Sequence, residues 1–507
     1  MVPQTPKEKT ISRESLKYDY AKCDLDYCDN YALLSHRVCF VCGGNYCYDH
    51  VEDIDHHICY TNPPKERIYK GCALDPYVSE VIAIRDNLDY DAVKEEVESI
   101  RCGHKCTDIE KPKNYLELRR VTGSFNTHIV IHFDDDVKWV MRIRRKESRC
   151  MPEEAIKECH YSELATLKTL EDQGVKIARS FQRPADSKIS EDLFYFYQEF
   201  VEGVPASKVF PWSFGNKDLT PAGIRFIHDY AAWTIDLEKI ISPQNVGCLR
   251  FDEEGSTSVG PHIEKGRNLS LNFPYTKGPF VTAKQRWLYS IECRMKWIID
   301  KRACSPRGEL HNYLILLEMK DLVTDCEEME QGPWYLKHYD LHQGNFRVDE
   351  ETGELRGVID WEWASFTCKA EAFAPPAWFG AFQFCSTELG KAGHQLIKAY
   401  DDLGRPDFAQ VVRNSAKYQW LEDTVMGANT QLPFLNATLR SFLYLPDETQ
   451  GEPKTLEHWT NCRLDRYSAD IGLQTLLWRR PTQPLPQLER PPPISKHQKG
   501  RVPGEDD

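Results

Sequence analysis

Three polar side chains in the C-terminal half of the chain have the chemistry that phosphoryl transfer requires. Transfer to a hydroxyl needs a carboxylate that accepts the hydroxyl proton and oxygen ligands that hold Mg²⁺ on the phosphates. Asp340 would be the base, Asn345 would reach the metal from the same loop, and Asp360 would take the main metal position. Apolar runs over 346–348 and 355–359 flank a turn at 351–353, which predicts a hairpin joining these residues. The alternative is a surface hairpin with satisfied polar groups.

The sequence around these residues resembles the aminoglycoside phosphotransferase and choline kinase family. The order His338-x-Asp340-x4-Asn345, followed by an apolar run and Asp360, is shared with protein kinases. Asp-Leu-His-Gln-Gly-Asn and Ile-Asp-Trp-Glu are closer to the small-molecule kinases, since protein kinases continue with Phe-Gly after the aspartate. The resemblance implies an α+β, two-lobed protein-kinase-like fold, with a small antiparallel-sheet lobe and a mostly helical larger lobe. Tyr339 departs from the glycine that relatives usually have there.

The same resemblance places an ATP site in the small lobe and at the hinge that follows it. Residues 123–126 stand where such kinases have their glycine-rich loop, without the triple-glycine form, and a plain hairpin turn is the alternative. The apolar run 194–201 resembles the fifth strand and the hinge, whose backbone would meet the adenine edge. The implied cofactor-binding residues are Gly123, Ser124, Phe125, Asn126, Arg142, Glu163, Glu199 and Val201.

Arg142 stands on a strand expected over 138–144, in which Trp139, Met141 and Ile143 share one face. The resemblance gives it the role of the phosphate-binding lysine of the third strand, held by Glu163 from a helix that begins near Ser162 or at Pro152. One alternative is that Arg142 is only a solvated charge on the strand. Another is that Arg144, two residues further on the same face, has the phosphate-binding role.

A dense group of cysteines and histidines lies near the N-terminus. Nine of the eighteen cysteines precede residue 110, and two closed tetrahedral zinc sites require eight ligands of this kind. The order resembles the AN-one cross-brace zinc finger, which implies one site of Cys23, Cys28, Cys47 and His50 and a second of Cys39, Cys42, His57 and Cys59. His56 competes with His57, and one zinc or none are the alternatives. Both zincs would be structural, with a protein partner for the finger.

The remaining segments complete the expected organisation. A helix is expected over 78–100, and Cys102, His104 and Cys106 offer three ligands for a further metal site. In the larger lobe, helices are expected over 224–237, 286–299, 371–384, 388–403, 408–424 and 438–443. The expected regions are a disordered N-terminus (1–20), a zinc finger (21–60), a linker with a helix (61–114), a small lobe (115–202), a large lobe (203–479) and a disordered proline-rich tail (480–507).

Composition narrows the classes of partner. The net charge of −14 disfavours a general nucleic-acid-binding protein and tolerates a cationic or polar small substrate. We find neither a long apolar run nor a secretory signal, so we expect a protein of the cytoplasm or nucleus with reduced thiols. Trp361, Trp363, Trp378 and Phe379 favour core packing over an aromatic cage for an amine.

Together these features predict an ATP- and Mg²⁺-dependent phosphotransferase that acts on a hydroxyl of a small molecule, with two structural Zn²⁺ ions in an N-terminal interaction module. The rival is a kinase-like scaffold without catalysis. Asp340, Asn345 and Asp360 together favour the enzyme, because inactive relatives generally lose the base or a metal ligand.

Overall fold

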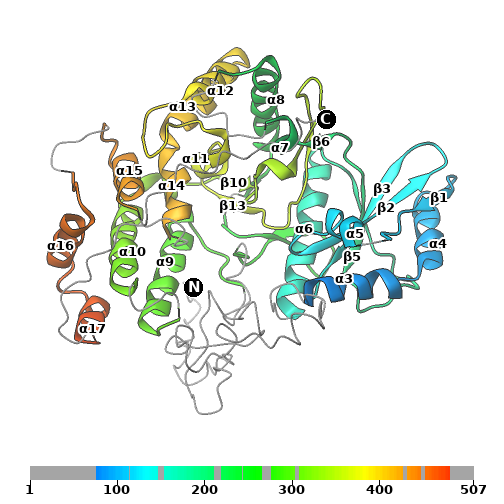
Figure 1. Ribbon diagram of the computed structural model, residues 1–507, viewed down its shortest axis with the longest axis horizontal. Coiled ribbons are helices and arrows are strands. Elements are labelled where there is room, and N and C mark those ends of the chain that lie inside the picture. Colours follow the sequence, from blue (N-terminus) through cyan, green and yellow to red (C-terminus); the bar gives the residue numbers. More distant parts are fainter. Residues whose placement is uncertain are drawn as a thin grey trace, which may run out of the picture.

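The computed structural model describes residues 76–113, 115–146, 153–210, 218–242, 244–264, 276–302, 308–425, 431–446 and 452–479. The expected zinc finger and the expected disordered segments at both ends lie outside these residues. Within them the chain forms a small sheet-containing lobe and a larger helical lobe, which lie side by side in Figure 1.

The small lobe is built on a five-stranded antiparallel sheet with the order β1-β2-β3-β5-β4. Its strands are β1 (Cys106–Ile109), β2 (Asn126–Phe133), β3 (Lys138–Arg144), β4 (Ser180–Gln182) and β5 (Tyr195–Glu199). The strands expected over 138–144 and within 194–201 are confirmed. Strand β1 comes from the segment expected to be a linker, so that segment contributes to the sheet.

Helices cover both faces of this sheet. Alternation along β3 places Trp139, Met141 and Ile143 in one apolar core with α4 (Tyr90–Ile100), whereas its arginines face α6 (Glu153–Asp172). The expected single helix over 78–100 is wrong in one respect. The chain breaks into α3 (Pro76–Asn87) and α4, because the Asp89 side chain caps α4 by accepting a hydrogen bond from the Ala92 N–H at 2.9 Å.

The larger lobe is mostly helical, and its helices pack around one large apolar core. Helix α8 (Pro221–Leu237) and helix α9 (Ala283–Ile299) confirm two of the expected helices. The other α-helices are α5 (Tyr115–Arg120) in the small lobe, then α7 (Ala206–Val209), α10 (Glu309–Thr324), α11 (Lys369–Ala372), α12 (Lys391–Asp402), α13 (Pro406–Asn414), α14 (Ala416–Val425), α15 (Leu432–Leu443), α16 (Leu456–Arg466) and α17 (Ile471–Arg479).

Two expected helices of this lobe are corrected. The segment 371–384 holds only the end of α11 and a short 3₁₀ turn, η5 (Ala377–Phe379), because Pro375 and Pro376 cannot donate backbone hydrogen bonds. The segment 408–424 is two helices, α13 and α14, which meet at Ser415.

A small three-stranded sheet stands at the start of the larger lobe, in the order β12-β11-β6. The hairpin of β11 (Phe346–Val348) and β12 (Leu355–Val358) is confirmed, and β6 (Val204–Pro205) pairs with β11 just after the hinge. Gly203 has a positive φ of 102°, and a β-carbon there would lie 2.5 Å from the Val348 carbonyl oxygen. Only glycine therefore lets the hinge approach the hairpin so closely.

Three further short strand pairings are formed. Strand β10 (Trp334–Lys337) lies between β7 (Ile241–Ser242) and β13 (Ser365–Thr367), and β8 (Leu249–Phe251) pairs with β9 (Thr257–Val259). The aromatic residues near the expected catalytic loop pack in the interior: Trp361, Trp363 and Phe379 are buried, and the Trp378 indole N–H donates to the Leu341 carbonyl at 2.7 Å. Core packing, the favoured use of these rings, is what the structure shows.

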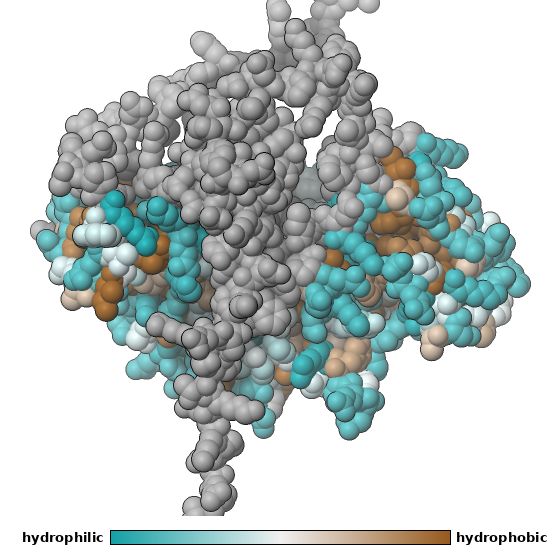
Figure 2. Space-filling model, turned by 90° about the horizontal axis from the view of Figure 1, so that it is seen from below, coloured by the Kyte–Doolittle hydropathy of each residue, from teal (hydrophilic) through white to brown (hydrophobic). Residues whose placement is uncertain are grey.

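Figure 2 shows mostly hydrophilic residues on one face, interrupted by smaller hydrophobic patches. Across the described ranges, every helix is too short or too polar to cross a membrane.

Candidate active site

The loop of residues 338–345, which the sequence predicts to be the catalytic loop, follows β10 directly, and the His338 ring contacts both this loop and the residue before Asp360. The Asp340 N–H donates to His338 Nδ1 at 3.1 Å, so the other ring nitrogen, Nε2, carries the proton and donates to the Ile359 carbonyl at 3.0 Å. The imidazole of His338 is buried. It thus links Ile359, which precedes the expected metal ligand Asp360, to the backbone of Asp340, the expected base.

Asn345 closes the loop at the start of the hairpin. Its side-chain amide donates to the Asp340 carbonyl at 2.8 Å, and its own carbonyl accepts from the Ile359 N–H at 3.0 Å. The turn is tight at Gly344, where a β-carbon would lie 2.7 Å from the His342 ring. The hairpin therefore brings Asn345 to the residue that precedes Asp360, as the sequence predicts.

Asp360 has a backbone conformation that few residues other than glycine adopt. Its φ is +70°, in the left-handed region, which aspartate tolerates better than most residues. Such strained positions concentrate where a side chain must point in one functional direction.

Arg142 links the sheet lobe to this loop. Its Nε donates to Glu163 at 3.2 Å, its Nη2 contacts the Asp360 carboxylate, and its Nη1 lies 3.2 Å from His128 Nε2. The Arg142 side chain is 7% exposed, so the alternative of a solvated strand charge is wrong. Helix α6, which starts just after Pro152, supplies Glu163 from a buried position.

Burial and pairing set the charges of this group. Burial disfavours the Arg142 cation, but Glu163 and Asp360 outweigh that effect and raise its pKa. Burial raises the pKa of Glu163, whereas the Arg142 cation outweighs burial at Asp360 and lowers that pKa. Burial, followed by the Arg142 charge, lowers the pKa of His128 to about 4, so its imidazole is neutral at pH 7. The site therefore holds a charged arginine against an ionised Asp360.

Arg144 has a different partner from Arg142. It contacts Glu362, which also accepts from the Asn126 side-chain amide at 3.3 Å and lies 3.9 Å from Arg142 Nη2. The side chains of Arg144 and Glu362 are each 2% exposed. Sequence reasoning assigned no role to Glu362, although its place two residues after Asp360 was a signal.

The expected glycine-rich loop lies against the segment that follows Asp360. The Phe125 and Trp363 rings meet edge to face with centroids 5.3 Å apart, while Gly123 and Ser124 are exposed. At the hinge, the Glu199 carboxylate pairs with Arg179 at 2.6 Å. The Glu199 N–H donates to the Arg179 carbonyl at 2.9 Å. The backbone N–H of Glu199, which was expected to contact adenine, is therefore already hydrogen-bonded to the neighbouring strand segment. Val201 is partly buried just beyond β5.

Tyr339 points away from the loop into a polar cluster that sequence reasoning did not find. Its hydroxyl donates to Glu371 at 2.9 Å, and Glu371 is fully buried. The same carboxylate accepts two contacts of 2.8 Å from Arg286 Nη2. Its other donors are Trp287 Nε1 at 3.0 Å, Thr367 Oγ1 at 2.6 Å and Lys337 Nζ at 3.3 Å. Burial opposes the charge of Glu371, but these cations outweigh it and lower its pKa.

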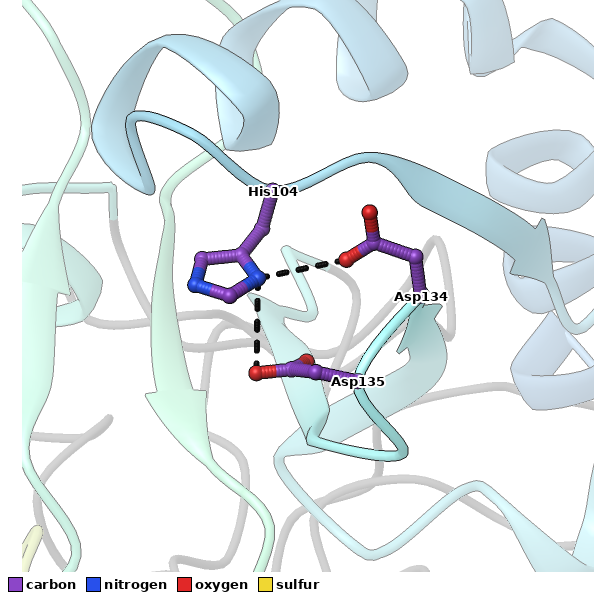
Figure 3. A group of neighbouring side chains, drawn as sticks. All are labelled: His104, Asp134 and Asp135. Atoms are coloured by element: carbon purple, nitrogen blue, oxygen red, sulfur yellow. Dashed lines mark hydrogen bonds and ion pairs between the residues drawn. The ribbon is translucent and has the colours of Figure 1, made fainter.

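Cys102, His104 and Cys106, the three ligands that the sequence offers for a further metal site, have other partners in the structure. The Cys102 thiol donates to the Ser99 carbonyl at 3.1 Å, and the Cys106 thiol donates to the Asp108 carbonyl at 3.7 Å. His104 instead lies 3.2 Å from Asp134 and 3.4 Å from Asp135, as Figure 3 shows. These three residues form the single metal-compatible group of the described ranges, but Asp135 is already bound by Arg101.

One curated protein is similar to part of this chain. The curated protein Y of the clavilactone A biosynthesis cluster in Ampulloclitocybe clavipes is 27% identical over 180 residues, covering 34% of this chain. The chain spans 38% of the length of that relative.

Two solved structures are similar at low identity. The gentamicin complex of APH(2")-IIa is 14% identical with a TM-score of 0.38, covering 72% of this chain and 98% of its own. The Plasmodium vivax ethanolamine kinase is 14% identical with a TM-score of 0.37, covering 70% and 82%. These TM-scores are too low to bear on what this chain binds.

The model of the phosphotransferase enzyme family (APH) matches residues 123–408, which is more than half of the chain. This stretch begins at the first residue of the expected glycine-rich loop and contains the catalytic loop, the hairpin and Asp360. The chain belongs to the phosphotransferase enzyme family.

Proposed function

We propose that this chain transfers the γ-phosphoryl group of ATP to a hydroxyl of a small molecule, with Asp340 as the base. The observation that carries the proposal is the contact of Arg142 with both Glu163 and Asp360. Residues 142, 163 and 360 come from a strand, a helix and a loop of two different lobes. In kinases, a basic strand residue that is paired with a helix glutamate and an aspartate that holds Mg²⁺ together position the nucleotide phosphates.

The donors present in the loop fit Mg²⁺. This ion prefers oxygen ligands such as carboxylates and amide carbonyls. Asp360 offers a carboxylate, and Asn345 offers its amide oxygen because its amide nitrogen already donates to the Asp340 carbonyl. Mg²⁺ held by these two residues would supply positive charge to the phosphates of ATP.

The chain's own residues would then position the reactants. The acceptor oxygen would bond to the γ-phosphorus while the bond to the β-phosphate oxygen breaks, and the hydroxyl proton would pass to the Asp340 carboxylate. His338 and Asn345 fix the Asp340 backbone from two sides. Arg142 would place its guanidinium fork against phosphate oxygens while it keeps Glu163 as a partner.

An acceptor screen tests this proposal. We expect ATP turnover with one or more hydroxyl-bearing small molecules, and the screen includes aminoglycosides and ethanolamine. Asp340→Asn should lower kcat by on the order of 10²- to 10⁴-fold and leave MgATP binding intact. The control is Asp325→Asn, because Asp325 is an exposed carboxylate at the end of α10. Turnover that is unchanged in Asp340→Asn would remove that residue from the role.

The N-terminal module remains part of the proposal. A finger with two structural zincs would bind a protein partner, and the catalytic region would act in the cytoplasm or nucleus. A catalytically inactive scaffold is the alternative, and failure of the wild-type chain to bind MgATP would favour it.

A further inference from the structure

Arg145 lies immediately after β3 and is tied to the loop of residues 123–126. Its Nη1 donates to the carbonyl of Gly123 at 3.3 Å and to that of Ser124 at 3.1 Å. Its backbone N–H donates to the Phe125 carbonyl at 2.9 Å. The Arg145 side chain is 1% exposed, so its buried guanidinium binds two successive carbonyls of the loop, and its backbone N–H binds the third.

Glu80 of helix α3 holds the other side of the same guanidinium. Its Oε2 accepts from Arg145 Nε at 3.1 Å and lies 3.0 Å from Arg145 Nη2, and the Glu80 side chain is 9% exposed. Helix α3 ends at Asn87, well before residue 123, where the family match begins. The contact therefore comes from a part of the chain that precedes the family region.

We infer that Glu80 and Arg145 are positioning residues for the nucleotide loop, so that helix α3 is a functional part of the ATP site. This inference rests on the proposed function, because it takes residues 123–126 as the loop that covers the phosphates. A loop whose carbonyls are bound to a buried cation has lost conformational freedom before the nucleotide arrives. The loop then loses less conformational entropy when ATP binds, so the affinity for ATP is higher.

A second pair in the same lobe provides a matched control. Arg101 follows α4 and donates to the two carboxylate oxygens of Asp135 at 2.8 and 2.6 Å. This pair also joins the segment before residue 123 to the sheet, at the turn between β2 and β3. The Arg101 guanidinium also lies 4.6 Å from the centre of the Phe133 ring. Its loss therefore removes contacts at this turn and leaves residues 123 and 124 bound to Arg145.

The experiment measures MgATP affinity by calorimetry and steady-state kinetics in the full chain. Glu80→Ala and Arg145→Ala should each raise Kd and KM for ATP by on the order of ten-fold, since a hydrogen-bonded charge is removed. The value of kcat at saturating ATP should stay within about two-fold, because the base and metal ligands are untouched. Arg145→Lys should recover part of the affinity, and Arg101→Ala should bind ATP as the wild type does.

The outcomes separate the two proposals. If the wild type binds no MgATP, the proposed function fails. If the wild type binds it and Glu80→Ala binds it equally well, only the role of Glu80 and Arg145 is overturned. Glu80→Gln covers the case in which Glu80→Ala does not fold, because the amide oxygen can still accept from the guanidinium while the charge is lost. Kd for MgATP should then rise by less than in Arg145→Ala, and an unchanged Kd in both Glu80→Gln and Arg145→Ala would overturn the inference. A lowered melting temperature with unchanged Kd would make the pair purely structural and overturn the inference.

Discussion

The Tyr339 hydroxyl donates a hydrogen bond to the Glu371 carboxylate at 2.9 Å, and this contact anchors the catalytic loop to helix α11. Tyr339 stands next to the expected base, in a position where the resemblance to small-molecule kinases implies a glycine. Glu371 is fully buried and is bound on its other sides by Arg286, Trp287 and Thr367. The larger side chain therefore gives the loop an attachment that a glycine could not provide.

Tyr339→Phe removes this hydrogen bond and keeps the ring. A hydrogen bond to a charged group contributes about 1.5–3 kcal/mol, so we expect a lower melting temperature and a kcat reduced by on the order of ten-fold. KM for ATP should change little, because Arg142 and Glu163 remain. Tyr335→Phe on β10 is the control. A normal kcat in Tyr339→Phe would show that the attachment serves stability alone.

Arg142→Ala should weaken MgATP binding and catalysis, because it removes the contact that joins Glu163 to Asp360. We expect KM for ATP to rise by on the order of 10- to 100-fold. Arg142→Lys should be partly active, since it keeps the charge and loses the fork. Steady-state kinetics at saturating acceptor measure both effects.

Arg144→Ala should act mainly on stability. It leaves Glu362 buried without its closest cation, and such losses cost about 3–5 kcal/mol. Chemical denaturation should therefore show a large decrease in the free energy of unfolding, while KM for ATP in the folded fraction stays within about three-fold. ATP affinity that responds to Arg144→Ala and not to Arg142→Ala would exchange the roles of the two arginines.

The stability of the described region should fall in mild acid. Burial, followed by a nearby arginine, lowers the pKa of His160 and of His262 from 6.5 to about 3. Both imidazoles are neutral when folded, so their contribution is complete above pH 6.5 and is lost as the pH falls toward 3. The free energy of unfolding should decrease by about 1.4 kcal/mol per pH unit for each histidine.

Denaturation at pH 7 and pH 5 measures this slope. His262→Gln should reduce it, because the unfolded chain then binds one proton fewer. His458→Gln, at an exposed position on α16, should leave it unchanged. Equal slopes in the wild type and in His262→Gln would contradict the assignment.

Two zinc ions per chain remain the prediction for residues 21–60. Elemental analysis should give two zincs for the wild type and for Cys102→Ser, whose thiol is exposed and donates to the Ser99 carbonyl. Cys39→Ser should lose one, since the remaining three ligands do not close a tetrahedral site. His57→Gln should also lose one zinc ion. Loss of a zinc ion in His56→Gln instead would show that His56 is the ligand.

The sequence by itself determined the parts of this protein that depend on short-range order. Asp340, Asn345 and Asp360 are joined by one hairpin, so their spacing and the turn between them were enough to bring Asn345 close to the residue before Asp360. Alternation along residues 138–144 likewise separated the apolar face of β3 from the face that carries Arg142. Local periodicity specifies the face on which a side chain lies.

Only the tertiary structure decided which charges meet. Arg145 bonds to Glu80, 65 residues earlier, Arg286 to Glu371, 85 residues later, and Arg144 to Glu362, 218 residues later. No periodicity relates such positions, because each pairing depends on how whole helices and strands pack. Buried charges are stable only when these partners are present, so the packing of both lobes, and not the local sequence, fixed the environment of the site.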